Sequence, residues 1–547
     1  MNKNAEKLVK RFNKIKGERH NWDDHWQECS DRVLPRKSDV YIEPWNRVKG
    51  EKKNNPTLLV DSTAVNANVN LAAALHSMLT NPSQKWFELT TGDDERDSEY
   101  ENALWLESAT DLMHNVFNSS NFQTEIHELY LDLGCFGTGV LEVLPDEESI
   151  IRFKSRPIYE VYIEEDATGK VNKIWREFEL PLGELSDIFG EESFSESMLK
   201  DLKKDPTKKE RLLHVICESA DAARMDYVME KGYKKDYVSM YVTTRKPHVI
   251  EMKGMNNFPY LTPRWSKLSG EVYGRSPAMS ALPDIKLINQ VKSNMIRYNQ
   301  KATDPPMLIP DDGFGLPVDL RPGGTTYVRA GTQDEIKTIP LLGQPLLTKD
   351  IMQDLQQDIR RAFFMDHLQL REGPQKTAQE VMQLSDESQR FMAPQLARQH
   401  DELLRPLVDI VLAQMLTRGM FGPIPRELAG REVKVRYTSQ IAKAQRASEG
   451  NSLMRALELS MPFIEMNPEA TDIYNHDEVL RYAGFITGLA AKLYRSPEEV
   501  EQIRASRAQQ QQLAQQMAAN ESSANTLNKL GSVQDIPGME QMAEELE

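Results

Sequence analysis

Two short motifs contain residue types that could bind a nucleotide or a metal ion. The glycines of GCFGTG at 134–139 suggest a phosphate loop, but their order differs from G-x-G-x-x-G and the G-K-[ST] of a P-loop is missing. The following LEVL at 141–144 favours a strand, whereas a phosphate site needs a helix N-terminus. His20, His25 and Cys29 share a helical segment, but the five-residue spacing turns the two imidazoles apart. We predict a tight turn and no metal site.

Signatures of hydrolases and metalloproteases are also missing, since the sequence contains neither G-x-S-x-G nor H-E-x-x-H. Acidic pairs such as Asp23-Asp24 and Asp311-Asp312 are typical of helix surfaces and turns. We therefore predict no enzymatic activity and no cofactor. A nuclease is the alternative of this class, and it would need clustered carboxylates that bind metal ions.

The composition is that of an acidic protein with several packed units. The chain has 547 residues, of which 27% are charged and 39% hydrophobic, and its net charge is −16. A chain of this length is too long for one core and favours roughly two to four units. The net charge argues against tight binding of nucleic acid over the whole surface.

Cysteine usage and hydropathy indicate a reducing compartment without membrane insertion. Cys29, Cys135 and Cys217 lie far apart, and their odd number provides no disulfide framework. The basic N-terminus lacks an apolar core, and no window approaches about eighteen apolar residues. We predict structural thiols, no signal peptide and no membrane span.

The clearest one-faced helix is predicted at 281–302, with Ser280 as its N-cap. Its apolar stripe consists of Leu282, Ile285, Ile288, Val291, Met295 and Tyr298. Its polar face has a basic bias from Lys286, Lys292, Arg297 and Lys301. A helix of this length spans roughly 33 Å. The simplest interpretation is a surface helix packed on its own domain.

Periodicity elsewhere predicts an α+β fold that is mostly α. Helical patterns cover 4–33, 62–79, 98–117, 121–133, 349–365, 377–418 and all of 440–494. Strand patterns occupy 85–89 and several segments between 140 and 252. Short helical segments at 181–189 and 194–204 interrupt those strands. The last helix, 496–519, is polar nearly all round, which is typical of a helix that is solvated or stacked beside copies of itself.

Five segments stand out in serial order: DSTAVNANVNLAAALHSMLTNPSQKWFEL (61–89), DLGCFGTGVLEV (132–143), YGRSPAMSALPDIKLINQVKS (273–293), ATDPPMLIPDDG (302–313), and KTAQEV with the helix after it (376–417). Taken in this order, they resemble the head-to-tail connecting, or portal, proteins of short-tailed bacteriophages. Each motif is short, but their common order over about 20–420 makes chance similarity improbable.

The resemblance implies a ring, usually of about twelve subunits, at one capsid vertex. Double-stranded DNA is packaged and ejected through such a ring. By similarity the chain divides into an N-terminal wing (1–180), a first stem segment (181–207), a strand-rich clip (208–272), a second stem helix (273–303), a C-terminal wing (304–420), a crown (421–495), a C-terminal barrel helix (496–520) and an acidic mobile tail (521–547).

The resemblance also implies site residues and partners. The channel lining would include Lys286, Lys292, Arg297 and Lys301. A tunnel loop at 365–375 would project toward DNA, with His367, Gln369, Arg371, Glu372, Gly373, Pro374 and the adjacent Lys376. Partner docking would use Tyr233, Lys234, Lys235, Arg245 and Lys246. Expected partners are identical subunits, the terminase large subunit, major capsid and scaffold proteins, tail adaptors, internal core or ejection proteins, and DNA bound transiently without sequence preference. The expected location is the virion, with assembly in the host cytoplasm.

Simple geometry agrees with such a conduit. Twelve helices about 10 Å apart give a ring roughly 38 Å across between axes and a bore of about 25–30 Å, wide enough for a duplex. Some of the basic side chains on this helix could instead pair with acids of neighbouring subunits. The tunnel-loop segment could also be a plain connection between two helices. The alternative function is a ring-forming scaffold or tail adaptor that does not conduct DNA.

Overall fold

The computed structural model forms two compact units, each described here by itself. Unit 1 comprises Met1–Trp86 and Leu112–Phe421, and unit 2 comprises Phe87–Asp111 and Gly422–Glu547. The structure describes residues 2–38, 40–41, 59–97, 99–224, 235–303, 307–308, 337–338, 345–368, 391–426, 428, 430, 433–437, 440–467, 472–487 and 493–531. Its described elements are helices and antiparallel strands, so the predicted mostly helical α+β class is confirmed.

The chain begins with two helices where one was predicted. α1 (Asn2–Glu18) and α2 (His20–Val33) meet at Arg19, and a 3-10 turn, η1 (Pro35–Lys37), follows. Arg19 is buried and donates hydrogen bonds to the carbonyl oxygens of Ile158 (3.0 Å) and Val161 (2.7 Å). Its guanidinium also lies 3.5 Å from the centre of the Tyr162 ring. The helix therefore breaks where a buried arginine binds a segment far along the chain.

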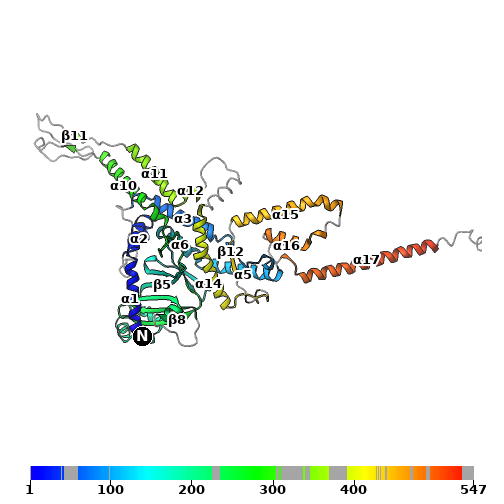
Figure 1. The fold of residues 1–547 in the computed structure, drawn as a ribbon, viewed down its shortest axis with the longest axis horizontal. Helices are drawn as coiled ribbons and strands as arrows, with labels where there is room; N and C mark the ends of the chain where they lie inside the picture. The colour runs from blue at the N-terminus through cyan, green and yellow to red at the C-terminus, as the bar shows by residue number, and fades with distance from the viewer. Residues whose placement is uncertain are drawn as a thin grey trace, which may run out of the picture. The chain divides into compact units, whose positions relative to one another are not determined.

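A five-stranded antiparallel sheet forms the β core of unit 1. The order is β4-β5-β6-β7-β8, with β4 (Val161–Glu165), β5 (Val171–Pro181), β6 (Lys209–Glu218), β7 (Tyr237–Thr243) and β8 (His248–Met255). A short helix, α9 (Ser219–Arg224), follows β6. Leu8 and Phe12 of α1 pack on one face of the sheet, on Trp175 and Val215 (Figure 1).

The opposite face of this sheet is covered by the segment 181–207. α7 (Leu182–Phe189), η4 (Glu191–Ser193) and α8 (Glu196–Lys204) pack on Phe178 and Leu212 through Leu185 and Met198. Successive side chains of a strand point to opposite faces, so Leu212 belongs to this side and Leu213 to the side of α1. The predicted interruption at Gly190 is present. The segment 181–207 is a pair of short helices on the sheet and not one continuous helix, and its assignment as the first stem segment stays a prediction.

A second, three-stranded sheet has the order β3-β2-β9, with β2 (Leu141–Pro145), β3 (Ile151–Ser155) and β9 (Tyr260–Leu261); η3 (Ile158–Glu160) follows β3. Asn121 lies beside β3, where it accepts a hydrogen bond from the backbone N–H of Phe153 and donates one to its carbonyl. α3 (Thr63–Leu79) packs on α6 (Phe122–Phe136), and a Cβ added at Gly134 of α6 would collide with the Asn68 side chain of α3.

Two long helices of unit 1 lie side by side: α10 (Pro277–Thr303) and α11 (Pro345–Ala362), which returns alongside α10 (Figure 1). α12 (Met365–Leu368) follows α11, and β10 (Met307–Leu308) pairs with β11 (Lys337–Thr338). Helical residues 391–399 continue into a π-helix, η5 (His400–Leu404), and then α14 (Arg405–Thr417). The π-helix lies directly before Pro406, which has no backbone N–H to donate.

Unit 2 contains a two-stranded sheet and long helices. β1 (Phe87–Thr90) pairs with β12 (Lys434–Tyr437), beside α4 (Asp94–Asp97) and the first part of α5 (Tyr100–Ser119). The remaining helices are α15 (Gln440–Met466), α16 (His476–Thr487) and α17 (Pro497–Gly531). α17 begins at the predicted place, where Ser496 accepts a hydrogen bond from the Glu499 N–H, but it continues beyond the predicted end near residue 519.

Candidate functional site

The site is built on α10, whose beginning is fixed by a tight glycine contact. Gly137 ends α6 with a φ of 76°, which confirms the tight turn predicted at 134–139. A Cβ added there would lie 2.5 Å from the carbonyl oxygen of Gly274. The predicted N-cap at Ser280 is wrong, because α10 begins earlier and Ser276 accepts a hydrogen bond from the Met279 N–H (3.0 Å). Ser276 also donates to the Cys135 carbonyl (2.8 Å), which fixes the helix start on α6.

The predicted apolar stripe of α10 is buried over its first half only. Leu282, Ile285 and Ile288 are buried. The later stripe residues Val291, Met295 and Tyr298 are intermediate in exposure. The first half of α10 is therefore embedded in unit 1, whereas the second half is more exposed.

Two of the four predicted channel cations are bound to carboxylates of the same chain. The Lys286 ammonium lies 2.6 Å from a carboxylate oxygen of Glu28, and the Lys292 ammonium lies 3.0 Å from one of Asp61. Both Lys286 and Glu28 are more than 40% exposed at the side chain, whereas Asp61 is only 2% exposed. Both acids belong to the same chain, so pairing with acids of neighbouring subunits stays a prediction.

Asp61 is the centre of a polar cluster that joins α3, α10 and α11. Besides Lys292, it accepts hydrogen bonds from the Thr63 N–H (2.9 Å) and the Gln356 side chain (3.3 Å). Asn289 of α10 accepts hydrogen bonds from the backbone N–H groups of Val60 and Asp61, at 2.7 and 2.8 Å. Burial acts to raise the pKa of Asp61, but these hydrogen bonds and the Lys292 ammonium outweigh it, so its pKa is lowered.

The other two predicted cations, Arg297 and Lys301, lie on the last turns of α10. Together with Ile296, Asn299 and Gln300 they line an open surface hollow. Neither has an ion-pair partner among the residues that the structure describes. The four cations therefore fall into two pairs, one bound to acids of the same chain and one without an acidic partner among the described residues.

The predicted docking residues are not brought together. Lys235 precedes β7 and donates a hydrogen bond to the Asn256 side chain (2.8 Å). Arg245 and Lys246 lie in the turn after β7, where Arg245 is 3.5 Å from a carboxylate oxygen of Glu179. A seven-residue strand separates the two groups by about 23 Å. Tyr233 and Lys234 lie outside the described residues.

The predicted tunnel loop is described only at its start. Residues 365–368 form α12, which includes the backbone of His367. Gln369, Arg371, Glu372, Gly373, Pro374 and Lys376 lie outside the described residues, and so does the acidic tail from 532. The loop and its role stay predictions.

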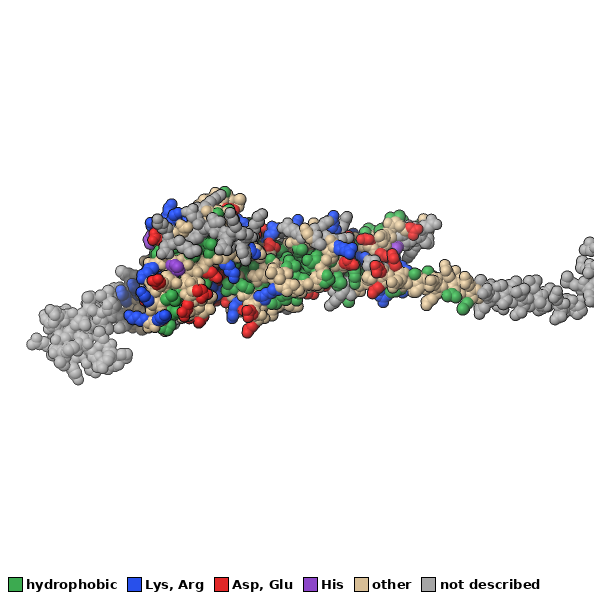
Figure 2. Space-filling model, turned by 90° about the horizontal axis from the view of Figure 1, so that it is seen from below, with side chains coloured by type: hydrophobic (Ala, Val, Ile, Leu, Met, Phe, Trp, Pro, Cys, Tyr) green, Lys and Arg blue, Asp and Glu red, His purple; other side chains and the backbone are tan. Residues whose placement is uncertain are grey.

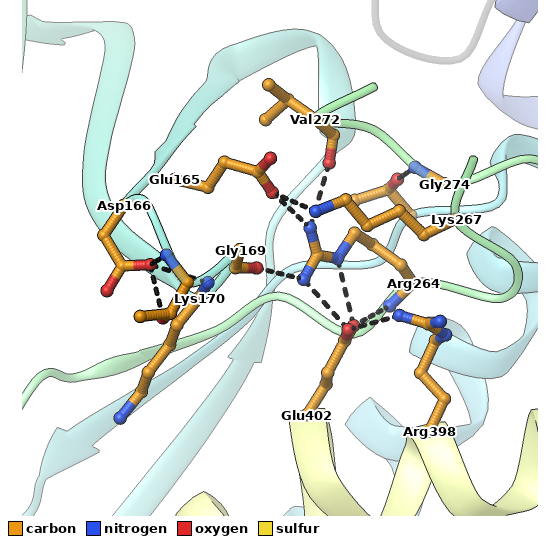
Figure 3. A network of polar contacts seen from close by, with 12 residues as sticks. Glu165, Asp166, Gly169, Lys170, Arg264, Lys267, Val272, Gly274, Arg398 and Glu402 are labelled. Atoms are coloured by element: carbon orange, nitrogen blue, oxygen red, sulfur yellow. Dashed lines mark hydrogen bonds and ion pairs between the residues drawn. The ribbon is translucent and has the colours of Figure 1, made fainter. Parts of the chain in front are cut away.

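Sequence reasoning missed a buried network around Arg264, in the linker between β9 and α10 (Figure 3). The guanidinium binds both oxygens of Glu402 (3.1 and 2.9 Å), one oxygen of Glu165 (2.9 Å) and the carbonyl of Gly169 (2.9 Å). The only sequence signal is one arginine within the apolar run FPYLTPRW. A buried arginine needs such partners, because an unpaired buried charge is costly.

A second buried network joins the two sheets. Tyr260 donates a hydrogen bond to Glu142 (2.6 Å), whose other oxygen binds Arg156. His214 contacts Ser239 at 2.8 Å and is stacked on Tyr241 with ring centres 4.0 Å apart. Burial lowers the pKa of His214 to about 3, so the ring is neutral at physiological pH. This network stabilises the packing of the sheets.

The cysteines are buried free thiols. Burial raises the pKa of Cys29 and Cys217 to about 12 and that of Cys135 well above its ordinary value, which makes all three poor nucleophiles. Across the described residues, no group of three or more His, Cys, Asp or Glu side chains is arranged to hold a metal ion. No helix in the described part of the chain has the length and apolarity needed to cross a membrane.

The visible face in Figure 2 carries basic and acidic side chains in small interspersed groups, with hydrophobic areas between them. This described part of the surface contains no broad basic area that would clamp nucleic acid. The mixed charge of this face agrees with the net charge of −16.

Comparison with known proteins identifies the family. Residues 5–494 match the family described as bacteriophage head to tail connecting protein, and the chain belongs to this family of structural virion components. It is 32% identical over 534 residues to the probable portal protein of Bordetella phage BPP-1, and the alignment covers 96% of this chain and 95% of the relative. It is 29% identical to the portal protein of Salmonella phage epsilon15, with 97% and 96% covered. The portal protein of Enterobacteria phage T3 is 20% identical over 76% of this chain and 75% of its own length.

Proposed function

We propose that the protein assembles into a ring at one capsid vertex and that double-stranded DNA passes through this ring during packaging and ejection. The observation that carries the proposal is the division of the cations on α10. Arg297 and Lys301 have no acidic partner among the described residues, on the half of α10 that is least covered by its own subunit. A conduit needs few and transient phosphate contacts, because each neutralised phosphate adds affinity and slows sliding.

We propose that the stem of each subunit consists of α10 and α11, in place of 181–207. The support is their packing along each other and the Asp61 cluster that links them. The end of this helix pair at Arg297 and Lys301 then points away from the two sheets (Figure 1). That end, rather than the predicted clip at 208–272, is our proposed docking surface for the terminase and, after packaging, for tail adaptors.

Unit 2 is our proposed contact with the inside of the capsid. Large apolar side chains are exposed on its helices, among them Leu459 (67%), Phe463 (69%) and Leu480 (67%). In a ring such surfaces are available to neighbouring subunits and to internal core or ejection proteins. The polar helix α17 would stack beside its copies in the proposed C-terminal barrel.

Imaging distinguishes a conduit from a ring-forming scaffold or tail adaptor. Negative-stain images of the purified full-length protein, with mass photometry on the same sample, are expected to reveal rings of about twelve copies with a hole wider than a duplex of about 20 Å. Rings with a narrower hole would favour the scaffold or adaptor. If no ring forms alone, adding scaffold protein tests whether assembly requires it; no ring under either condition would contradict the proposal.

A salt titration tests the division of the cations. Binding of a short duplex to the ring is measured from 50 to 200 mM salt for Arg297→Gln with Lys301→Gln and, as the matched control, for Lys286→Gln with Lys292→Gln. Each lost phosphate contact lowers the slope of log affinity against log salt by about 0.9. We expect the first pair to lower the slope by about 1 or more, and the control pair to leave it unchanged. Equal slopes for both pairs would refute the assignment.

A further inference from the structure

Arg264 binds three separate parts of unit 1 at once (Figure 3). Its guanidinium reaches Glu165 and Gly169 at the turn between β4 and β5, and Glu402 in the π-helix. It also donates to the Val272 carbonyl (3.2 Å), which lies in its own linker. The sheet, the linker and the helix that contains Glu402 therefore share one buried cation.

The backbone of Arg264 is held by the same helix. Its N–H donates to a carboxylate oxygen of Glu402 (2.9 Å), and its carbonyl accepts a hydrogen bond from the Gln399 side chain (2.9 Å). Gln399 is completely buried, and the Arg264 side chain is 4% exposed. The linker cannot shift along the helix without breaking both backbone contacts and the bidentate ion pair.

The two elements joined here are those next to the proposed DNA contacts. The linker runs from β9 to the start of α10, which carries Arg297 and Lys301. The helical segment 391–417 comes directly after residues 369–390, which follow α12 and contain most of the predicted tunnel-loop residues. A displacement of either element thus acts on Arg264.

We propose that Arg264 is a positioning residue that couples α10 to helix 391–417, so that the two elements open and move together. The proposal rests on the proposed function for its biological meaning, although the coupling itself is a property of one subunit. The physical reason is charge pairing in a buried place. Removing one carboxylate leaves the guanidinium incompletely paired, and this weakens its remaining contacts to both elements.

Charge balance makes Glu402 the sensitive partner. Two carboxylates, Glu165 and Glu402, face three cations, since Lys267 lies 2.5 Å from Glu165 and Arg398 lies 2.9 Å from Glu402. Neutralising Glu402 leaves Arg264 and Arg398 with no carboxylate from the helix. Neutralising Glu165 would instead release the turn between β4 and β5.

Hydrogen–deuterium exchange on the purified full-length protein tests the coupling. For Glu402→Gln we expect amide exchange to rise at least about tenfold both at 400–412 and at the start of α10, 277–288, while β6 keeps its protection. A merely local structural role would raise exchange at 400–412 alone. Glu402→Asp, which keeps the charge on a shorter side chain, is expected to give a smaller rise in the same two segments.

Glu271→Gln is the matched control. Glu271 also binds an arginine of the same linker, Arg275 (2.8 Å), whose side chain is 48% exposed. The Arg275 guanidinium lies over the Trp22 ring of α2, so the described contacts of this pair do not connect the linker to helix 391–417. We expect its exchange pattern to equal that of the parent. A rise for Glu402→Gln in only one segment, in neither, or uniformly including β6 would overturn the proposal. The assay needs neither DNA nor a conducting ring, so failure of the proposed function is detected separately.

Discussion

Replacing Lys292 or Lys286 by methionine compares the stability contribution of a partly buried ion pair with that of an exposed one on the same helix. The Lys292 ammonium lies 3.0 Å from the almost fully buried carboxylate of Asp61. Losing a hydrogen bond to a charged group costs about 1.5–3 kcal/mol. Lys292 is one-third exposed, so water screens part of this effect, and we expect about 2 kcal/mol for Lys292→Met. Lys286→Met removes the exposed pair with Glu28 and is expected to cost less than about 1 kcal/mol.

The assay is hydrogen exchange of the amides at 286–296, which reports the free energy of opening α10 without assuming two-state unfolding of the whole chain. Each tenfold rise in exchange corresponds to about 1.4 kcal/mol. The double variant Asp61→Asn with Lys292→Met is expected to cost less than the sum of the single changes, because the buried charge left by losing Lys292 is then absent. Equal costs for the two lysines, or additive costs in the cycle, would refute the reasoning.

The pH dependence of this pair has a defined sign. The pKa of Asp61 is lowered in the folded protein, so the unfolded chain binds its proton first as the pH falls. The stabilisation by Asp61 is fully present above its ordinary pKa of about 3.9 and is lost as the pH falls through the lower folded pKa. The difference in the free energy of opening α10 between Lys292→Met and the parent is therefore expected to vanish at strongly acidic pH.

Two further predictions concern the framework around the site. Gly137→Ala places a Cβ against the Gly274 carbonyl at a positive φ and is expected to lower the free energy of unfolding by about 3 kcal/mol or more. Gly419→Ala, also at a positive φ but in open space, is expected to cost about 1 kcal/mol. Thermal melting compares the two variants, and equal losses would contradict the packing argument. His214, with its pKa lowered to about 3 by burial, stays neutral in the fold but is protonated below about pH 6.5 when unfolded, so the sheet should lose about 2 kcal/mol between pH 6.5 and 5. His214→Gln is expected to abolish that slope in hydrogen exchange of β6, and an unchanged slope would assign it to other groups.

Local patterns predicted most helices and strands, because periodicity and caps act over a few residues. The LLHVIC run lies inside β6, and the Ser-Pro-Glu-Glu start of α17 is present as expected. The break at Arg19 was missed, because its partners Ile158 and Val161 lie about 140 positions away. Pairing of β5 with β6 across 181–207 is likewise a long-range contact, which no periodicity within that segment reports.

The stem assignment shows the limit of reasoning from one helix. The sequence correctly marked α10 as long and one-faced, but an apolar stripe does not state which element covers it. The partner was expected in 181–207, whose Leu185 and Met198 instead face the five-stranded sheet. α11 was recognised as a helix at 349–365, yet only the three-dimensional structure relates its Gln356 to Asp61.

The same limit explains why four cations of one face were treated alike. On the sequence, Lys286, Lys292, Arg297 and Lys301 belong to one predicted helix. Their difference comes from distant acids: Glu28 binds Lys286 from 258 positions away, and Asp61 binds Lys292 from 231 positions away. A cation held by a carboxylate in its own subunit must break that pair before it binds a phosphate, and the broken pair costs most where the acid is buried. In the proposed channel, Lys292 would therefore be the poorest DNA contact of the four despite its central place on the helix.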